Sequence, residues 1–100
     1  MPKLYEYLGI IVFFYSREHE PIHVHGRYGE HENKIEILFE KGVVKSIRVL
    51  NVIGRKPLPS KQKKEFKTLV TKLSDEIVQS WINFFIYDKK IVTKKIAGKL

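Results

Sequence analysis

The chain contains no cysteine, only two aspartates and no long apolar run. The absence of cysteine excludes a disulfide framework, a thiolate metal site and a cysteine nucleophile. The longest apolar run, residues 9–15, is the length of a strand and too short to span a membrane. The N-terminus lacks the charged and then apolar pattern of a secretory signal. These absences predict a cytoplasmic protein that does not associate with membranes.

Several functional motifs are also missing from the sequence. It has no Gly-rich phosphate loop, no nucleophile elbow and no His-Glu-x-x-His segment. It has no internal repeat and no stretch that is typical of an interdomain linker. One hundred residues with 43% hydrophobic content predict a single domain, residues 1–100, with one core.

The net charge of +8 is unevenly placed along the chain. Residues 1–40 carry four basic and seven acidic groups, whereas residues 41–100 carry fifteen basic and four acidic groups. Such asymmetry favours a polyanionic partner, and RNA or DNA is the commonest one. The alternative is that the lysines only keep the protein soluble.

Segments that alternate or are rich in β-branched residues predict four or five strands in a largely antiparallel sheet. These segments are residues 3–7, 10–15, 23–28, 34–40 and 43–50. Residues 10–15 are apolar at both parities, which is typical of a central strand. Gly29-Glu30 and Lys41-Gly42 are predicted turns, the second within a hairpin.

Residues 60–86 are predicted to be helical, as one kinked helix or as two, with Ser60 as the first N-cap and Ser74-Asp75 as the second. Apolar residues recur there at steps of three and four, and they include Phe66, Leu69, Val70, Leu73, Ile77, Val78, Trp81, Phe84 and Phe85. This stripe is expected to cover one face of the sheet and to leave the other partly solvated, which gives an α+β fold. Residues 89–100 hold five lysines and are predicted to be a basic tail or an edge strand.

All four histidines lie within 13 residues, from His19 to His31. Because side chains two apart on a strand share a face, His23, His25 and Arg27 are predicted to form a row on the polar face. Ile22, Val24 and Tyr28 are expected on the other face, towards the core, with Gly26 leaving room between them. Imidazole suits proton transfer and the binding of borderline metals, so this segment is the candidate site.

Three chemistries fit the histidine segment. The first is a divalent, zinc-like metal held by His19, His23 and His25, with or without a nearby carboxylate. The second is metal-free catalysis on a phosphodiester, in which His23 and His25 act as base and acid and Arg27 stabilises the phosphate charge. The third is binding of nucleic acid without catalysis. Further candidate binding residues for nucleic acid are Glu18, His19, Tyr28, Lys61 and Lys64.

Structural roles are the alternative for each of these residues. His19 could fix the turn at Pro21 through a hydrogen bond, and His31 is expected to be solvated in a polar turn. Arg27 could pair across the sheet with Glu36 or Glu40, which would be a surface ion pair of under about 1 kcal/mol. His23 and His25 could belong to a structural hydrogen-bond network instead of a site.

The segment Phe13-Phe-Tyr-Ser-Arg-Glu-His-Glu-Pro-Ile-His-Val-His25, followed by Arg27-Tyr-Gly29, resembles the bacterial domain-of-unknown-function family 4160. The family motif maps onto Glu18, His19, Pro21, His23, His25, Tyr28 and Gly29. A helix that ends near a tryptophan, here Trp81, is similar to the family as well. Ile22 departs from the proline that the family often has at that position. The resemblance implies that His19, His23 and His25 form a site, but it assigns them no role.

Members of this family are often associated with gene pairs of the toxin–antitoxin type, which implies a cognate partner protein encoded nearby. We therefore expect a nucleic-acid-linked domain, either an RNA-cleaving enzyme or a binding module. The alternatives are a metal-binding domain or metal-dependent hydrolase, and a protein-interaction module that docks through its free sheet face or edge. The sequence leaves open whether the protein is an enzyme and in which oligomeric state it acts.

Overall fold

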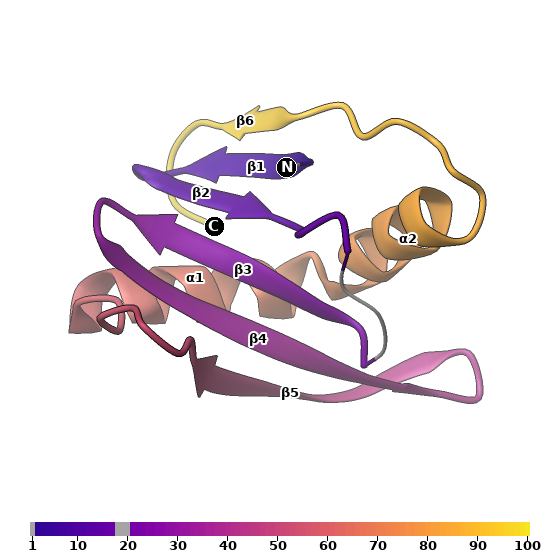
Figure 1. The fold of residues 1–100 in the computed structure, drawn as a ribbon, viewed down its shortest axis with the longest axis horizontal. Helices are drawn as coiled ribbons and strands as arrows, with labels where there is room; N and C mark the ends of the chain where they lie inside the picture. The colour runs from indigo at the N-terminus through magenta and orange to yellow at the C-terminus, as the bar shows by residue number, and fades with distance from the viewer. Residues whose placement is uncertain (1, 18–20) are drawn as a thin grey trace.

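The computed structural model describes residues 2–17 and 21–100, and it has the predicted α+β architecture (Figure 1). Six strands form one sheet in the order β5-β4-β3-β2-β1-β6. Their bounds are β1 Lys3–Tyr7, β2 Ile10–Phe13, β3 His23–Tyr28, β4 His31–Glu40, β5 Val43–Asn51 and β6 Lys94–Ile96. Neighbouring strands from β1 to β5 pair in antiparallel fashion, whereas β6 pairs with β1 in parallel. Strand β6 comes from the lysine-rich segment 89–100 and forms the edge beyond β1.

Two of the hairpins turn through residues with positive φ. Lys41 and Gly42 have φ of 51° and 81° and connect β4 to β5, so the predicted hairpin turn at this dipeptide is confirmed. Leu8 and Gly9, with φ of 50° and 81°, connect β1 to β2 in the same way. Positive φ at both central residues is the geometry of a type I′ turn, whose twist matches that of paired strands.

The helical region consists of two helices, α1 (Ser60–Lys72) and α2 (Ser74–Phe85), separated at Leu73. The prediction that Ser60 caps the first helix is wrong, because Pro59 occupies the N-cap and its carbonyl accepts the Lys63 amide at 2.8 Å. Leu73, in place of the predicted Ser74-Asp75, occupies the N-cap of α2. The two helices are neither long nor apolar enough to cross a membrane, and no other described segment is helical.

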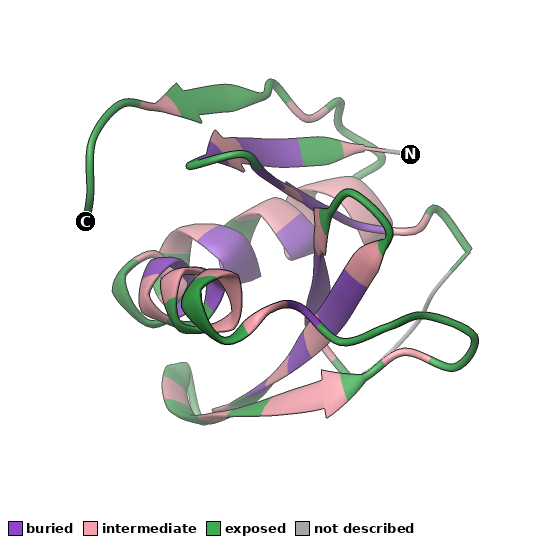
Figure 2. Ribbon diagram, turned by 90° about the vertical axis from the view of Figure 1, so that its left-hand side faces the viewer, coloured by how far each residue is buried: buried purple, intermediate pink, exposed green. Residues whose placement is uncertain are grey.

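The core lies between the two helices and one face of the sheet (Figure 2). A Cβ atom on Gly26 would lie 2.8 Å from the ring of Phe66, so this glycine allows α1 to pack directly against β3. Val24, on the same side of β3 as Gly26, is fully buried. We call this side of the sheet the helix face. The opposite side, to which His23, His25 and Arg27 point by strand alternation, is the histidine face.

Candidate functional site

The histidine face brings together His23, His25 and Arg27, as their spacing predicts. It is less solvated than predicted, however, because His23 and His25 are only 8% and 3% exposed. The ring of His25 stacks on Phe13 with a centroid distance of 5.5 Å and meets the edge of Tyr15 at 4.5 Å. The His23 and His25 rings lie 5.4 Å apart. The two imidazoles therefore form part of a small aromatic cluster on the sheet.

A buried carboxylate, that of Glu32, lies at the centre of this cluster. Its Oε2 accepts a hydrogen bond from Nδ1 of His25 at 3.0 Å and one from the hydroxyl of Tyr15 at 3.1 Å. Arg55 approaches the other oxygen, with 3.6 Å between Nε and Oε1. Glu32 itself is 0% exposed. A buried carboxylate needs such partners, because an isolated charge would be costly away from water.

The hydrogen bonds of the histidines define which ring nitrogen carries the proton. Nδ1 of His23 lies 2.7 Å from the carbonyl oxygen of Pro21, and Nδ1 of His25 faces the Glu32 carboxylate. Both acceptors require Nδ1 to be the donor, so Nε2 carries the lone pair of each neutral ring. In an imidazole of this tautomer, Nε2 is the nitrogen that can act as a general base or as a metal ligand. In His23 this atom is buried.

Cationic side chains surround the buried dyad of His25 and Glu32. Arg27 lies over the ring of Phe13, with 5.2 Å from Cζ to the ring centroid. The prediction that Arg27 pairs with Glu36 or Glu40 is wrong, because the register sets Arg27 opposite Glu32. Glu36 instead accepts a hydrogen bond from Arg48 at 2.6 Å.

The titration of Tyr15 reflects the same surroundings. Burial raises the pKa of its hydroxyl, and the negative charge of Glu32 raises it further, while Arg27 and Arg55 oppose this shift. The hydroxyl therefore stays protonated at neutral pH and donates its hydrogen bond to Glu32. Positive charge from both arginines thus reaches the centre of the histidine face.

Two predicted site residues, Glu18 and His19, lie outside the described residues. Of the three residues predicted to bind a metal, His23 and His25 are therefore described and His19 is not. Within residues 2–17 and 21–100, no group of three histidine or acidic side chains is placed to hold a metal ion.

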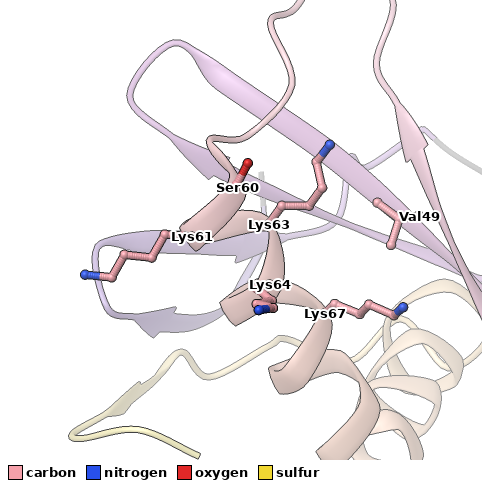
Figure 3. A pocket seen from close by; sticks show the side chains of 6 residues that line it. All are labelled: Val49, Ser60, Lys61, Lys63, Lys64 and Lys67. Carbon is pink, nitrogen blue, oxygen red and sulfur yellow. The ribbon is translucent and has the colours of Figure 1, made fainter.

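The remaining predicted binding residues lie away from the histidine row. Tyr28 follows the parity of Gly26, is 37% exposed at the end of β3 and lies next to Gly9. Lys61 and Lys64 project from α1, which packs on the helix face. They line a depression of about 630 Å³ together with Val49 of β5, Ser60, Lys63 and Lys67 (Figure 3). The structure thus separates these lysines from the histidines by the thickness of the sheet.

His31 is predicted to be solvated in a polar turn. In the structure it also forms a hydrogen bond to the loop between β5 and α1. Its Nδ1 donates to the carbonyl oxygen of Pro57 at 3.0 Å, and Lys56 bridges to it through the backbone. The neighbouring Asn33 is fully buried, and its Oδ1 accepts the Leu58 amide at 2.8 Å. This loop therefore connects the start of β4 to the start of α1.

Sequence reasoning missed Tyr15, Glu32 and Arg55 as members of the site. The signal for Glu32 was present in the predicted turn at Gly29-Glu30. A two-residue turn sets residues 28 and 31 opposite each other, which places Glu32 across from Arg27 and diagonal to His25. The approach of Arg55 depends on the path of a loop, which no periodicity predicts.

A comparison with protein families finds a match for most of the chain. A family model described as a domain of unknown function (DUF4160) matches residues 9–82, which include β2 to β5, α1 and most of α2. Comparisons with curated proteins and with solved structures gave no match. The matched segment contains His23, His25, Glu32 and Arg55, so the dyad and its cationic surroundings lie within the family domain. The chain belongs to the DUF4160 family of domains of unknown function.

Proposed function

We propose that this domain binds single-stranded RNA across the histidine face. The observation that carries the proposal is a set of cationic side chains beside a partly exposed ring, that of Tyr15, on a sheet face that neither of the described helices covers. Arg27 lies over the ring of Phe13, Arg55 approaches Glu32, and Lys34 pairs with His25 in the register of β3 and β4. Sheet faces of this composition recognise single strands by stacking bases on rings and by binding phosphates with basic side chains.

The shape of the histidine face supports the same proposal. A depression of about 280 Å³ lies beside the row and is lined by Pro21, Glu36, Ile37, Leu38, Ser46 and Arg48. Glu36 pairs with His23 in the sheet register, so the depression adjoins the histidine end of the row. A base or a phosphate in this depression would lie within reach of Arg48, which is 71% exposed.

The binding proposal is tested with fluorescein-labelled single-stranded RNA of ten uridines. We expect Arg27→Ala/Arg55→Ala to lower the affinity by about tenfold or more and to reduce its salt dependence, because two phosphate contacts are lost. Lys89→Ala/Lys90→Ala removes the same charge from a segment away from the face and serves as the control. An equal loss in both variants would contradict a site on the histidine face.

A second candidate function is metal-free cleavage of the bound RNA. The arrangement of the rings favours it, since the two rings lie 5.4 Å apart and an oxygen accepts the Nδ1 proton of each. One ring, neutral at the start, would accept at Nε2 the proton of a 2′-hydroxyl, and the other, already protonated at Nε2, would donate that proton to the departing 5′-oxygen. The products would be a 2′,3′-cyclic phosphate and a 5′-hydroxyl. Glu32 would stabilise the positive charge that forms on His25, and Arg27 the charge on the phosphate.

Cleavage is distinguished from binding by His23→Ala and His25→Ala, each assayed on RNA and on the same oligonucleotide with 2′-deoxy sugars. The catalytic proposal expects cleavage of RNA alone, loss of cleavage in both variants and retained binding. Growth arrest on expression of the parent, relieved in both variants, would support a toxin role. Binding without cleavage by the parent would leave the domain as a binding module.

The same orientation of Nδ1 is typical of histidines that bind a metal, where a second oxygen orients each ligand. A zinc-like ion on His23 and His25 is therefore the alternative use of these rings. Metal content by mass spectrometry on untagged protein, compared with His23→Ala/His25→Ala, tests it. Near-stoichiometric metal that disappears in the variant would favour this alternative, and its absence from both proteins would contradict it.

A further inference from the structure

The depression beside α1 lies at a free edge of the sheet. Strand β5 is terminal in the sheet order, and none of the described strands pairs with its outer edge. It spans nine residues, and its pairing with β4 has a register shift between Leu38 and Phe39, so the regular row of outward-facing backbone N–H and C=O groups runs along residues 46–51. This row can accept another strand. Val44, Ile47 and Val49 of β5 are half-buried against the core and give this edge an apolar side.

Lysines of α1 overhang this edge. Figure 3 shows Lys63 and Lys67 reaching from the helix towards Val49, whereas Lys61 points to the opposite side of α1. Lys63 and Lys67 are four apart, so they share one face of the helix. Among the described residues, no acidic side chain lines this depression, and β5 itself contains none. The groove between β5 and α1 therefore combines the apolar side chain of Val49, an open strand edge and excess positive charge.

We propose that this groove binds an extended acidic peptide segment of a partner protein. The segment would add as a strand to the edge of β5 and place its carboxylates on Lys63 and Lys67. Addition of a strand to an open edge is a common mode of peptide recognition, in which backbone pairing gives affinity and side-chain pockets give specificity.

Two other occupants fit the groove less well. A second copy pairing through β5 would add Lys45 and Arg48 of each chain to one interface with no acidic side chain in either strand, and like charges on paired strands are destabilising. Nucleic acid would satisfy the lysines but has no backbone amide to pair with β5. The described lining also lacks the aromatic rings and arginines on which bases stack. Charge and backbone geometry together favour an acidic peptide.

The probe is a nine-residue peptide of alternating Glu and Val, labelled with fluorescein and blocked at both ends. We expect it to bind the parent, and Lys63→Glu/Lys67→Glu to weaken binding by about tenfold or more, since two attractions become repulsions. Lys89→Glu/Lys90→Glu makes the same change of net charge elsewhere and should alter the affinity by less than about twofold. Thermal unfolding of each variant verifies that it is folded.

Two measurements separate strand addition from attraction by charge alone. A peptide of identical sequence with alternate backbone nitrogens methylated keeps its charge but cannot pair with a strand, and we expect it not to bind. Hydrogen exchange of the parent with the unmodified peptide should protect alternate amides of β5. Equal binding of the methylated peptide, unchanged exchange in β5, or preferential binding of a nine-nucleotide RNA through Lys63 and Lys67 would overturn the proposal.

Discussion

The two faces of the sheet differ in where their charged side chains lie, which is in a buried network on one face and at the surface on the other. On the histidine face, Glu32 is completely buried and is satisfied by His25, Tyr15 and Arg55. On the helix face, the lysines that line the groove of α1 are exposed or half-buried, and no acidic side chain of the described residues lies in the lining. Buried charges with several partners are costly to break, whereas exposed charges in excess contribute little to stability and act mainly on association. We therefore expect substitutions in the buried network of the first face to affect folding as well as binding, and substitutions of the exposed lysines on the second face to affect binding alone.

The loop between β5 and α1 connects these two regions. Arg55 contacts Glu32 on the histidine face, and three residues later the Leu58 amide is bound by Asn33 within the core. The loop ends at Pro59, which caps α1. A change at the start of β4 can therefore reach both faces, and the following predictions separate their contributions.

Glu32→Ala should have the largest effect. It leaves the Tyr15 hydroxyl and Nδ1 of His25 without their acceptor and opens a small cavity, so we expect a loss of about 3 kcal/mol in the free energy of unfolding. Denaturation in urea measures this loss. Lys61→Ala/Lys64→Ala, on the other face, should change the same quantity by less than about 0.5 kcal/mol. Similar losses in the two variants would remove the distinction between the faces.

Gly26→Ala should have the next largest effect, because it pushes apart the layers that separate the two faces. The new methyl group would lie 2.8 Å from the ring of Phe66, so α1 must shift or the ring must rotate. Overpacking of this kind costs about 1–3 kcal/mol. Phe66→Leu in the same background frees space, and we expect it to recover part of the loss. Additive losses in the double variant would show that Gly26 acts in some other way.

The sequence predicts much of the fold because its elements follow from local periodicity and turn chemistry. The hairpin at Lys41-Gly42 and the row of His23 and His25 both depend on residues close in sequence. The burial of the two histidines does not, because it arises from Phe13 and Tyr15 of another strand and from Glu32 beyond the next turn. The alternation of polar residues predicts that the histidines lie on a solvated face. In the structure they are buried in a network of hydrogen bonds and ring contacts. The same limit applies to Lys61 and Lys64. The net charge of the chain does not indicate that they lie on the face of the sheet opposite the histidines.

Asn33→Ala should have an intermediate effect. Nδ2 of Asn33 donates to the carbonyl oxygen of Leu50 at 2.9 Å and to Oδ1 of Asn51 at 3.1 Å, and its Oδ1 accepts the Leu58 amide. The substitution leaves the buried amide of Leu58 unsatisfied, at a cost of about 1–2 kcal/mol. Hydrogen exchange should show the largest loss of protection at Leu58 and in the first turn of α1. Uniform loss over the whole chain would contradict a local role for Asn33.

Glu76→Gln should have the smallest effect, since this residue lies on α2 at the surface, away from both the dyad and the groove. Hydrogen bonds from Tyr5 and then Lys94 lower the pKa of Glu76 below its ordinary value of 4.5. Because the folded-state pKa is the lower one, its contribution is present above pH 4.5 and is lost as the pH falls through the folded value. Glu76 is 41% exposed, so the contribution is below about 0.5 kcal/mol.

Urea denaturation at pH 5 and pH 3 measures this contribution. The free energy of unfolding of Glu76→Gln should fall less over this range than that of the parent, and the two losses should differ by less than about 0.5 kcal/mol. Glu65→Gln removes one carboxylate from α1 and controls for the change in net charge.

In the alkaline range the pH dependence has the opposite sign, because stability is lost as the pH rises. Burial, and then Glu76, raises the pKa of Tyr5, so its contribution is complete below pH 10.0 and is lost above it. Since burial is the larger cause, the alkaline loss should persist in Glu76→Gln, which distinguishes the buried tyrosine from its exposed partner.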